Sequence, residues 1–136
     1  MYTVYGDRLS GNCYKVKLAL HLLGLPYQWR EVDILKGETQ TAEFLAMNPN
    51  GKVPVLQLED GTCLWESNAI LNFLADGSDL LPREPRLRTQ VLQWQFFEQY
   101  SHEPTWRWRV SSSSTWACPK SAARSMRVAR RAVTRR

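Results

Sequence analysis

Four consecutive residues, Ser10-Gly11-Asn12-Cys13, precede the first segment with a helical pattern. The start of a helix exposes backbone N–H groups and the positive end of the helix dipole, which together stabilise an anion such as a thiolate. The Ser10 hydroxyl or the Asn12 amide could donate a further hydrogen bond to that anion. The simpler alternative is that one of them only caps the helix. The spacing leaves both interpretations open.

A second turn carries Lys52 and the dipeptide Val53-Pro54, which begins a β-prone stretch. A proline in a strand must lie at its start or at a sheet edge. If the peptide bond is cis, the neighbouring backbone is left to pair with an extended peptide ligand. Lys52, with Asn50 shortly before it, could hold a carboxylate. The simpler alternatives are a plain edge strand and a solvated lysine.

A third turn carries Glu66-Ser67 before another helical pattern. Ser67, as the predicted N-cap, offers a hydroxyl and helix N–H groups to a carboxylate. Glu66 could pair with an ammonium group, so the two residues suit the zwitterionic end of an amino acid. Capping alone is again the simpler interpretation.

The elements that must position these turns follow from residue patterns. Apolar residues at Val16, Ala19, Leu20 and Leu23 form one helix face, and a β-prone run stands on each side of it, which predicts a parallel β-α-β unit. The following segments predict a short helix, a hairpin around Asp60-Gly61, and a last helix. The expected strands are at 2–5, 27–32, 53–58 and 63–65. The expected helices are one that starts just after residues 10–13 and ends at Gly24, a short one at 42–47, and one that is capped by Ser67 and ended by residues 76–78.

Composition separates the chain into two parts. Its 136 residues fit one ordinary domain, and 43% hydrophobic content allows a core. Residues 1–104 hold 9 Lys and Arg and all 13 acids, whereas residues 105–136 hold 9 Lys and Arg and no acid. A helix opened by Pro85 is expected to run to about His102. We expect no leader peptide and no membrane span.

The three cysteines, Cys13, Cys63 and Cys118, are an odd number and far apart. This spacing argues against a disulfide framework and against a zinc site, so we expect no metal and a reduced, cytoplasmic protein. Cys13 is expected to be a small buried packing residue.

The three turns, in this order and spacing, resemble one family. Residues 1–82 look like the N-terminal thioredoxin-like domain of a bacterial cytosolic glutathione S-transferase. The matching stretches are Ser10-Gly11-Asn12-Cys13-Tyr14-Lys15-Val16, Asn48-Pro49-Asn50-Gly51-Lys52-Val53-Pro54-Val55-Leu56 and Glu66-Ser67-Asn68-Ala69-Ile70. Residues 83–104 resemble the linker and first helix of the family's all-α second domain. The resemblance implies an α/β fold with a thioredoxin-like βαβ-αββα domain.

The resemblance also implies roles in binding glutathione as co-substrate. Ser10 would stabilise the glutathione thiolate, with Asn12 as a rival or helper. The backbone of Val53, beside a cis Pro54, would pair with the cysteinyl residue. Glu66 and Ser67 would hold the γ-glutamyl end, and Lys52, with Asn50, the glycyl carboxylate. Conjugation to a small electrophile, detoxification and a possible homodimer are implied in the same way.

Residues 105–136 depart from the family pattern. We expect a disordered basic tail, produced by reading the codons after residue 104 out of frame, in place of the family's later helices. On that hypothesis conjugation would be weak or absent, and whether the chain is an active enzyme stays open. One alternative function is a glutathione-dependent disulfide reductase. Another is a non-enzymatic protein that binds nucleic acid through the tail. The simpler interpretation is that the tail is an unselected peptide, which could also bind nucleic acid nonspecifically.

Overall fold

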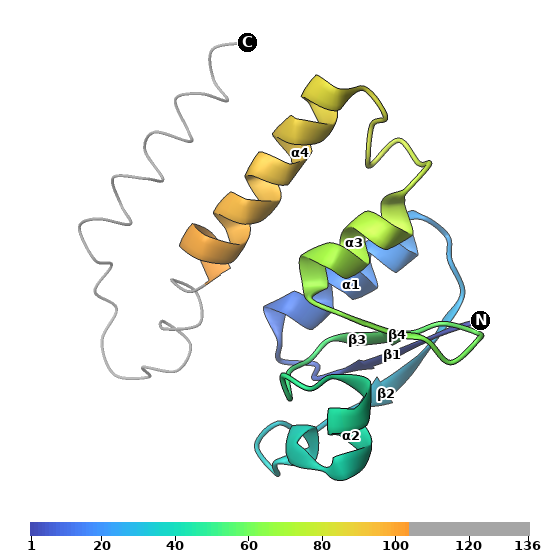
Figure 1. Cartoon of the computed structure of the whole chain (residues 1–136), viewed down its shortest axis with the longest axis vertical. Coiled ribbons are helices and arrows are strands. Elements are labelled where there is room, and N and C mark those ends of the chain that lie inside the picture. The colour runs from blue at the N-terminus through green and yellow to red at the C-terminus, as the bar shows by residue number, and fades with distance from the viewer. Residues whose placement is uncertain (104–136) are drawn as a thin grey trace. The chain divides into compact units, whose positions relative to one another are not determined.

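The fold is a four-stranded mixed sheet with helices on both faces (Figure 1). A computed structural model describes residues 1–103, so the predicted disorder and altered frame of residues 105–136 lie outside the described residues. The strands are β1 (Tyr2–Gly6), β2 (Tyr27–Glu31), β3 (Val55–Gln57) and β4 (Cys63–Trp65). The helices are α1 (Gly11–Leu22), α2 (Ala42–Met47), α3 (Ser67–Ala75) and α4 (Pro85–Phe97), with a short 3-10 helix η1 (Glu38–Gln40) and a π-helix η2 (Glu98–His102).

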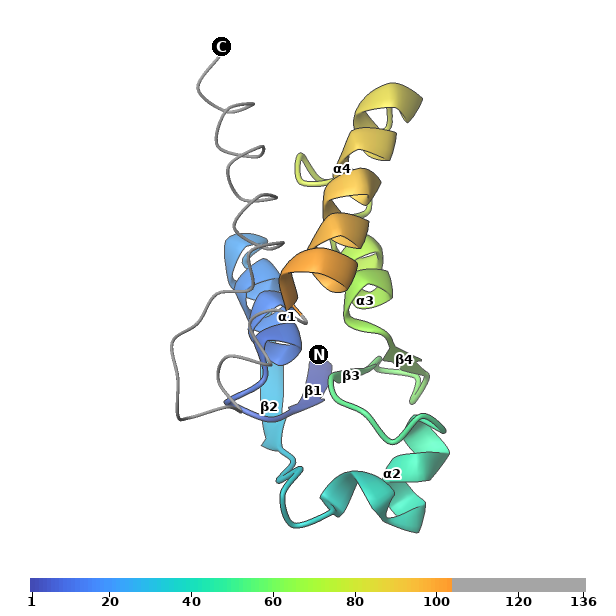
Figure 2. The same cartoon turned by 90° about the vertical axis from the view of Figure 1, so that its left-hand side faces the viewer.

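The strand order is β2-β1-β3-β4, and only the β1–β2 pair is parallel. A parallel pair needs a crossover, which α1 supplies, while β3 and β4 are joined by a hairpin around Gly61. Helices α1 and α3 lie side by side on one face of the sheet, and α2 lies on the other (Figures 1 and 2). The predicted βαβ-αββα arrangement is therefore confirmed.

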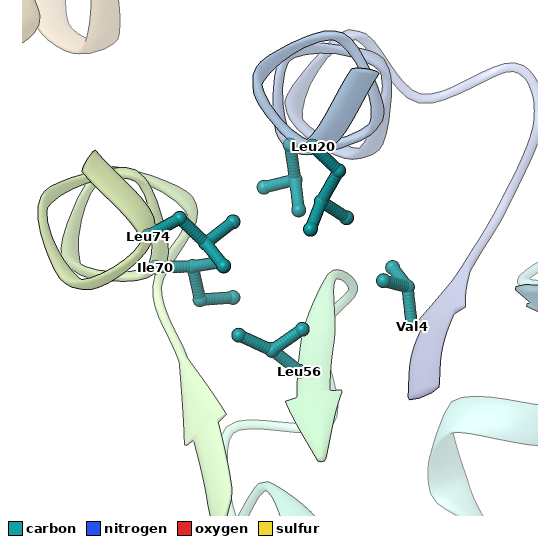
Figure 3. Close-up of a cluster of buried hydrophobic side chains, with 6 residues drawn as sticks. Val4, Leu20, Leu56, Ile70 and Leu74 are labelled. Carbon is teal, nitrogen blue, oxygen red and sulfur yellow. The ribbon is translucent and has the colours of Figure 1, made fainter. Parts of the chain in front are cut away.

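Two strands alternate their side chains between the two helix layers. Val4 of β1 and Leu56 of β3 are partners in the sheet register, and both are buried against α1 and α3 (Figure 3). Their neighbours Tyr5 and Val55 belong to the cluster on the opposite face, with Phe44 of α2. Because side chains alternate along a strand, a shift of one residue would exchange the two sets and expose the core. The first cluster comprises Val4, Val16, Leu20, Leu56, Ile70 and Leu74.

Helix α1 ends as its sequence predicts. Gly24 has φ of 64°, a conformation that glycine adopts without a Cβ penalty. Its N–H donates to the His21 carbonyl, and the Leu25 N–H donates to the Leu20 carbonyl. These two bonds form a Schellman motif, which returns the chain toward β2.

Two expected boundaries change by more than one residue. Strand β3 begins at Val55, after Pro54, because proline has no N–H to donate to a ladder. Helix α4 ends at Phe97 and continues as η2, although the sequence predicted one helix to about His102. Contacts divide the chain into two units, Met1–Leu92 and Gln93–Arg136. The predicted domain boundaries at residues 82 and 104 stay predictions.

The loop between β1 and α1 is held by the carboxylate of Glu31, at the end of β2. Glu31 accepts hydrogen bonds from the Trp29 indole N–H at 2.7 Å and from the Arg8 backbone N–H at 3.1 Å. Asp7 adds two bonds within the loop, from the N–H groups of Leu9 and Ser10. Consequently the segment that enters α1 is attached to its neighbouring strand.

Gly6 is required where β1 passes under Trp29. A Cβ on Gly6 would lie 2.6 Å from Trp29 Cη2 and 3.1 Å from Cys13 Sγ. The indole has little freedom to move because Glu31 holds its N–H. We therefore expect Gly6→Ala to destabilise the fold by about 1–3 kcal/mol, as overpacking does, in urea unfolding. Gly11→Ala is the matched control, since no atom lies within 4 Å of its added Cβ; equal losses in the two variants would contradict the steric argument.

Glu31 gives the fold a pH dependence of known sign. Hydrogen bonds from Trp29, and then from Arg8, lower the pKa of Glu31 from its ordinary 4.5. Its ionised form therefore stabilises the fold above pH 4.5, and this contribution is lost as the pH falls through the lower folded-state pKa. We expect Glu31→Gln to lower the melting temperature at neutral pH, and the difference from wild type to shrink at about pH 3. A deficit that is constant with pH would refute this.

Candidate functional site

The three predicted turns meet at one edge of the sheet. In the register, Tyr5 of β1 pairs with Val55 of β3, and Val55 pairs with Trp65 of β4. These residues stand at the end of β1, the start of β3 and the end of β4. Three segments therefore join the sheet beside these three paired residues: the loop that leads to Ser10, the loop that ends at Pro54, and the turn at Glu66.

Ser10 caps α1 by accepting a hydrogen bond, and its hydroxyl hydrogen is not used in that bond. Its backbone is extended, with φ of −83° and ψ of 120°, and its Oγ accepts the Cys13 N–H at 3.4 Å. The structure therefore confirms that Ser10 caps the helix, and its role toward a thiolate stays a prediction. Because the capping bond uses only a lone pair of the oxygen, the hydroxyl hydrogen can still be donated to an anion at the helix start.

Cys13 is a packing residue, as expected. Its side chain is 0% exposed. Burial raises the pKa of the Cys13 thiol from its ordinary 9.0, and the hydrogen bond with Ser10 opposes that rise only in part. The thiol is therefore protonated at neutral pH and is poorly suited to act as a nucleophile.

A hydrogen bond joins the starts of the two helices. The Ser67 hydroxyl donates to Asn12 Oδ1 at 3.2 Å, across 55 positions of sequence. Ser67 is only 4% exposed, so this bond satisfies a buried polar group. The bond brings the first and third predicted turns together, which sequence spacing alone did not predict.

The predicted cap of α3 is wrong by one residue. The helix begins at Ser67, and Glu66 occupies the N-cap position without a side-chain capping bond. Glu66 has φ of 69°, which an L-residue with a Cβ adopts at a cost of about 1–3 kcal/mol. Its side chain is exposed, so its carboxylate lies at the surface beside the helix start.

The 48–54 turn is organised by a residue that the sequence analysis gave no individual role. Asn48 is 2% exposed; its Nδ2 donates to the Lys52 carbonyl at 2.7 Å, and its Oδ1 accepts the Asn50 N–H at 3.0 Å. The dense turn signal at Asn48-Pro49-Asn50-Gly51 was the available clue, because asparagine side chains bond to backbone two residues on. The Lys52 side chain is exposed.

Gly51 and the following peptide bond complete this turn. Gly51 has φ of 58°, and a Cβ there would lie 2.5 Å from Gln40 Nε2. The Val53–Pro54 bond is cis, as the family resemblance implied. Val53 lies before Pro54 and the first residue of β3, Val55, so the Val53 backbone is outside the β-ladder.

Other kinds of site receive little support from the described part of the chain. Among residues 1–103, no group of three or more His, Cys, Asp or Glu side chains could hold a metal ion. Within the same range, none of the helices has both the length and the apolar composition of a membrane span.

Comparison with known proteins supports one family. The family model for the glutathione S-transferase N-terminal domain matches residues 9–76, half of the chain. The crystal structure of a glutathione S-transferase from Pseudomonas fluorescens Pf-5 is 81% identical with a TM-score of 0.75, covering 76% of this chain and 52% of that chain. Glutathione S-transferase 1 of Schizosaccharomyces pombe is 37% identical over 112 residues, covering 77% of this chain and 49% of the relative.

A third relative is a glutathione transferase homologue from Sulfitobacter, whose crystal structure contains bound glutathione. It is 29% identical with a TM-score of 0.72, covering 93% of this chain and 61% of that chain. The chain thus spans about half the length of the first two relatives. The expected thioredoxin-like fold is confirmed. The chain belongs to the glutathione S-transferase family, and residues 9–76 match its N-terminal domain.

Proposed function

We propose that the edge of the sheet binds glutathione and stabilises its thiolate for conjugation to a small electrophile. One observation carries this proposal. Tyr5, Val55 and Trp65 are paired across three adjacent strands, and this pairing places the three polar turns at the same edge of the sheet. Glutathione is an extended tripeptide with a thiol, two carboxylates and one ammonium group, so three separated polar turns are suited to its three residues.

The thiol would lie at the start of α1. Helix N–H groups, with a hydrogen bond from Ser10 or Asn12, lower the pKa of a thiol placed there. The thiol loses its proton to solvent, and the thiolate sulfur then forms a bond to the electrophilic carbon. If the electrophile carries a leaving group, that group departs with the electron pair of the bond that breaks.

The remaining groups would hold the peptide. The Val53 backbone, beside Pro54, pairs with the cysteinyl residue as a short added strand. Lys52, with Asn50, attracts the glycyl carboxylate. Glu66 pairs with the γ-glutamyl ammonium. The N–H groups at the start of α3, beginning with that of Ser67, donate hydrogen bonds to the γ-glutamyl carboxylate.

Two further observations support this proposal. The Sulfitobacter homologue was crystallised with glutathione bound. The three turns also contain the polar types that the ligand requires. Conjugation, detoxification in the cytoplasm and homodimer formation belong to the proposal, because the chain spans about half the length of its first relatives. The expected weakness of conjugation stays a prediction that concerns residues 105–136.

Glutathione-dependent reduction of disulfides is the alternative activity. The buried, protonated Cys13 offers no support for a protein dithiol, so such an enzyme would rely on glutathione alone. A disulfide-exchange assay beside a conjugation assay separates the two activities. Turnover of a disulfide without any conjugation product would favour the reductase.

Lys52 provides a test of the binding mode. Its side chain is exposed, so its pairing with the glycyl carboxylate is worth about 0.5–1 kcal/mol. We expect Lys52→Ala to raise the Kd for glutathione about two- to fivefold in calorimetry. The control ligand is a glutathione whose glycyl carboxylate is replaced by an amide, for which the variant and wild type should bind alike. An absence of heat with a folded wild-type chain at millimolar glutathione would refute the proposed function.

Removal of the thiolate donor provides a test of the chemistry. A hydrogen bond to a charged group is worth about 1.5–3 kcal/mol, equivalent to about one to two pKa units. We expect Ser10→Ala or Asn12→Ala, whichever removes the donor, to raise the thiol pKa of bound glutathione by that amount. The pKa is measured by titrating the thiolate absorbance against pH. Cys13→Ala is the control and should leave this pKa unchanged, because the Cys13 thiol is buried and protonated. Unshifted values in both the Ser10 and the Asn12 variants would contradict the proposed roles.

A further inference from the structure

The 48–54 turn contains an asparagine whose side chain is chemically labile. An asparagine that precedes glycine can lose its side-chain amide, because a glycine has no Cβ to crowd the backbone nitrogen that attacks the amide carbon. Five asparagines occur in the sequence, and among them Asn50 alone is followed by glycine, Gly51. The Asn50 side chain is exposed, so water has access to the reacting amide. The sequence and the exposure together single out Asn50.

The other four asparagines are placed less favourably for this reaction. Asn48 precedes Pro49, whose ring nitrogen carries no hydrogen to lose in the attack. Asn12 of α1 and Asn68 and Asn72 of α3 lie inside helices, and each precedes a residue that has a Cβ. A helix fixes the backbone through its ladder of hydrogen bonds, which opposes ring closure. These four residues therefore serve as internal controls.

In the folded turn, the attacking nitrogen is held in a hydrogen bond. The Gly51 N–H donates to the Asn48 carbonyl at 2.9 Å, and the Asn50 N–H donates to Asn48 Oδ1 at 3.0 Å. The buried Asn48 amide also donates to the Lys52 carbonyl at 2.7 Å, so one side chain bonds on both sides of the reactive pair. Ring closure removes the hydrogen of the Gly51 nitrogen, so its bond to the Asn48 carbonyl must break. The turn must therefore open before Asn50 reacts.

We propose that Asn50 is a site of spontaneous deamidation, and that the Asn48 hydrogen bonds set its rate by holding the turn closed. The Gly51 nitrogen loses its proton to solvent and forms a bond to Cγ of Asn50. The bond from Cγ to the side-chain nitrogen breaks, and ammonia leaves with a proton taken from solvent. Water then opens the cyclic imide at either carbonyl. The products are aspartate and isoaspartate, in which the main chain runs through the side-chain carbon.

Both products change the turn that is proposed to hold the glycyl carboxylate of glutathione. Aspartate at position 50 places a negative charge near Lys52, which opposes binding of that carboxylate. Isoaspartate adds a backbone atom between the two groups that the Asn48 side chain bonds, the Asn50 N–H and the Lys52 carbonyl. The effect on glutathione rests on the proposed function, whereas the reaction at Asn50 does not.

The first test follows each asparagine of the full 136-residue chain at mildly alkaline pH, by peptide mapping and mass spectrometry. We expect replacement of NH₂ by OH at Asn50 before the other asparagines. The reaction should be about tenfold or more faster in guanidinium chloride, where the turn hydrogen bonds are absent. A folded chain in which Asn50 reacts no faster than Asn68 and Asn72, or as fast as in the unfolded chain, would overturn the inference.

Two variants test the control of the rate by the turn. Asn48→Ala removes both side-chain hydrogen bonds and should accelerate the conversion of Asn50 about tenfold or more. Gln40 Nε2 donates to the Gly51 carbonyl at 3.4 Å, so Gln40→Ala should accelerate the conversion to a smaller degree. The Gln40 side chain is exposed, so this variant keeps the test available if Asn48→Ala does not fold.

The matched control for these variants is Ile70→Val. It weakens the core cluster packed against α1 and α3 and leaves the turn hydrogen bonds intact, so Asn50 should convert at the wild-type rate in the folded protein. Wild-type rates in both turn variants would overturn the proposed control of the rate. An acceleration by Ile70→Val equal to that by Asn48→Ala would overturn it as well, because conversion would then follow global unfolding.

The third test measures the consequence for ligand binding and separates it from the proposed function. The Asn50→Asp variant and the converted wild-type chain, isolated by ion exchange, are titrated with glutathione in a calorimeter. We expect a Kd about two- to fivefold higher for Asn50→Asp than for the fresh wild-type chain. Equal Kd values for all three proteins would overturn this consequence. A fresh wild-type chain that fails to bind glutathione would refute the proposed function, while the mass change at Asn50 would still test the reaction.

Discussion

The pairing of Val4 with Leu56 in the centre of the sheet is the constraint on which the other features depend. Both side chains are buried against α1 and α3, and burial of such aliphatic groups stabilises a fold by about 1.5–3 kcal/mol for each side chain. Because this pairing fixes the register, it also fixes which strand ends stand side by side. The row of Tyr5, Val55 and Trp65 follows directly from it, and so does the meeting of three loops that are distant in sequence.

In the proposed function, helix starts stabilise negative charge on the ligand more than ionised side chains do. Both α1 and α3 begin beside the edge, so their N–H groups and dipoles offer two places for negative charge. The buried Cys13 lies at the first of these places but stays protonated, because burial raises the pKa of its thiol. The positive end of α1 is therefore suited to a thiolate that the ligand brings, rather than to a thiolate of the protein.

The surrounding loops are held by side chains that make no proposed contact with the ligand. Glu31 attaches the β1–α1 loop to β2, and Asn48 bonds to both arms of the turn that carries Lys52. Such supporting bonds keep binding groups in place before a ligand arrives, which reduces the entropy lost on binding. Glu66, with φ of 69°, lies between the end of β4 and the first turn of α3, where its carbonyl accepts the Ile70 N–H.

The sequence by itself determined the order of the elements and the family, because helix and strand periodicities, the Gly24 stop and the three motif stretches are local signals. It did not determine the start of β3 or the cap of α3, where one residue of difference depends on the ladder and on the conformation of Glu66. Only the tertiary structure brought Ser67 to Asn12, buried Cys13 and gave Glu31 and Asn48 their supporting roles. Contacts such as the Ser67–Asn12 bond join residues far apart in the chain, and no local pattern in either partner encodes the other's position.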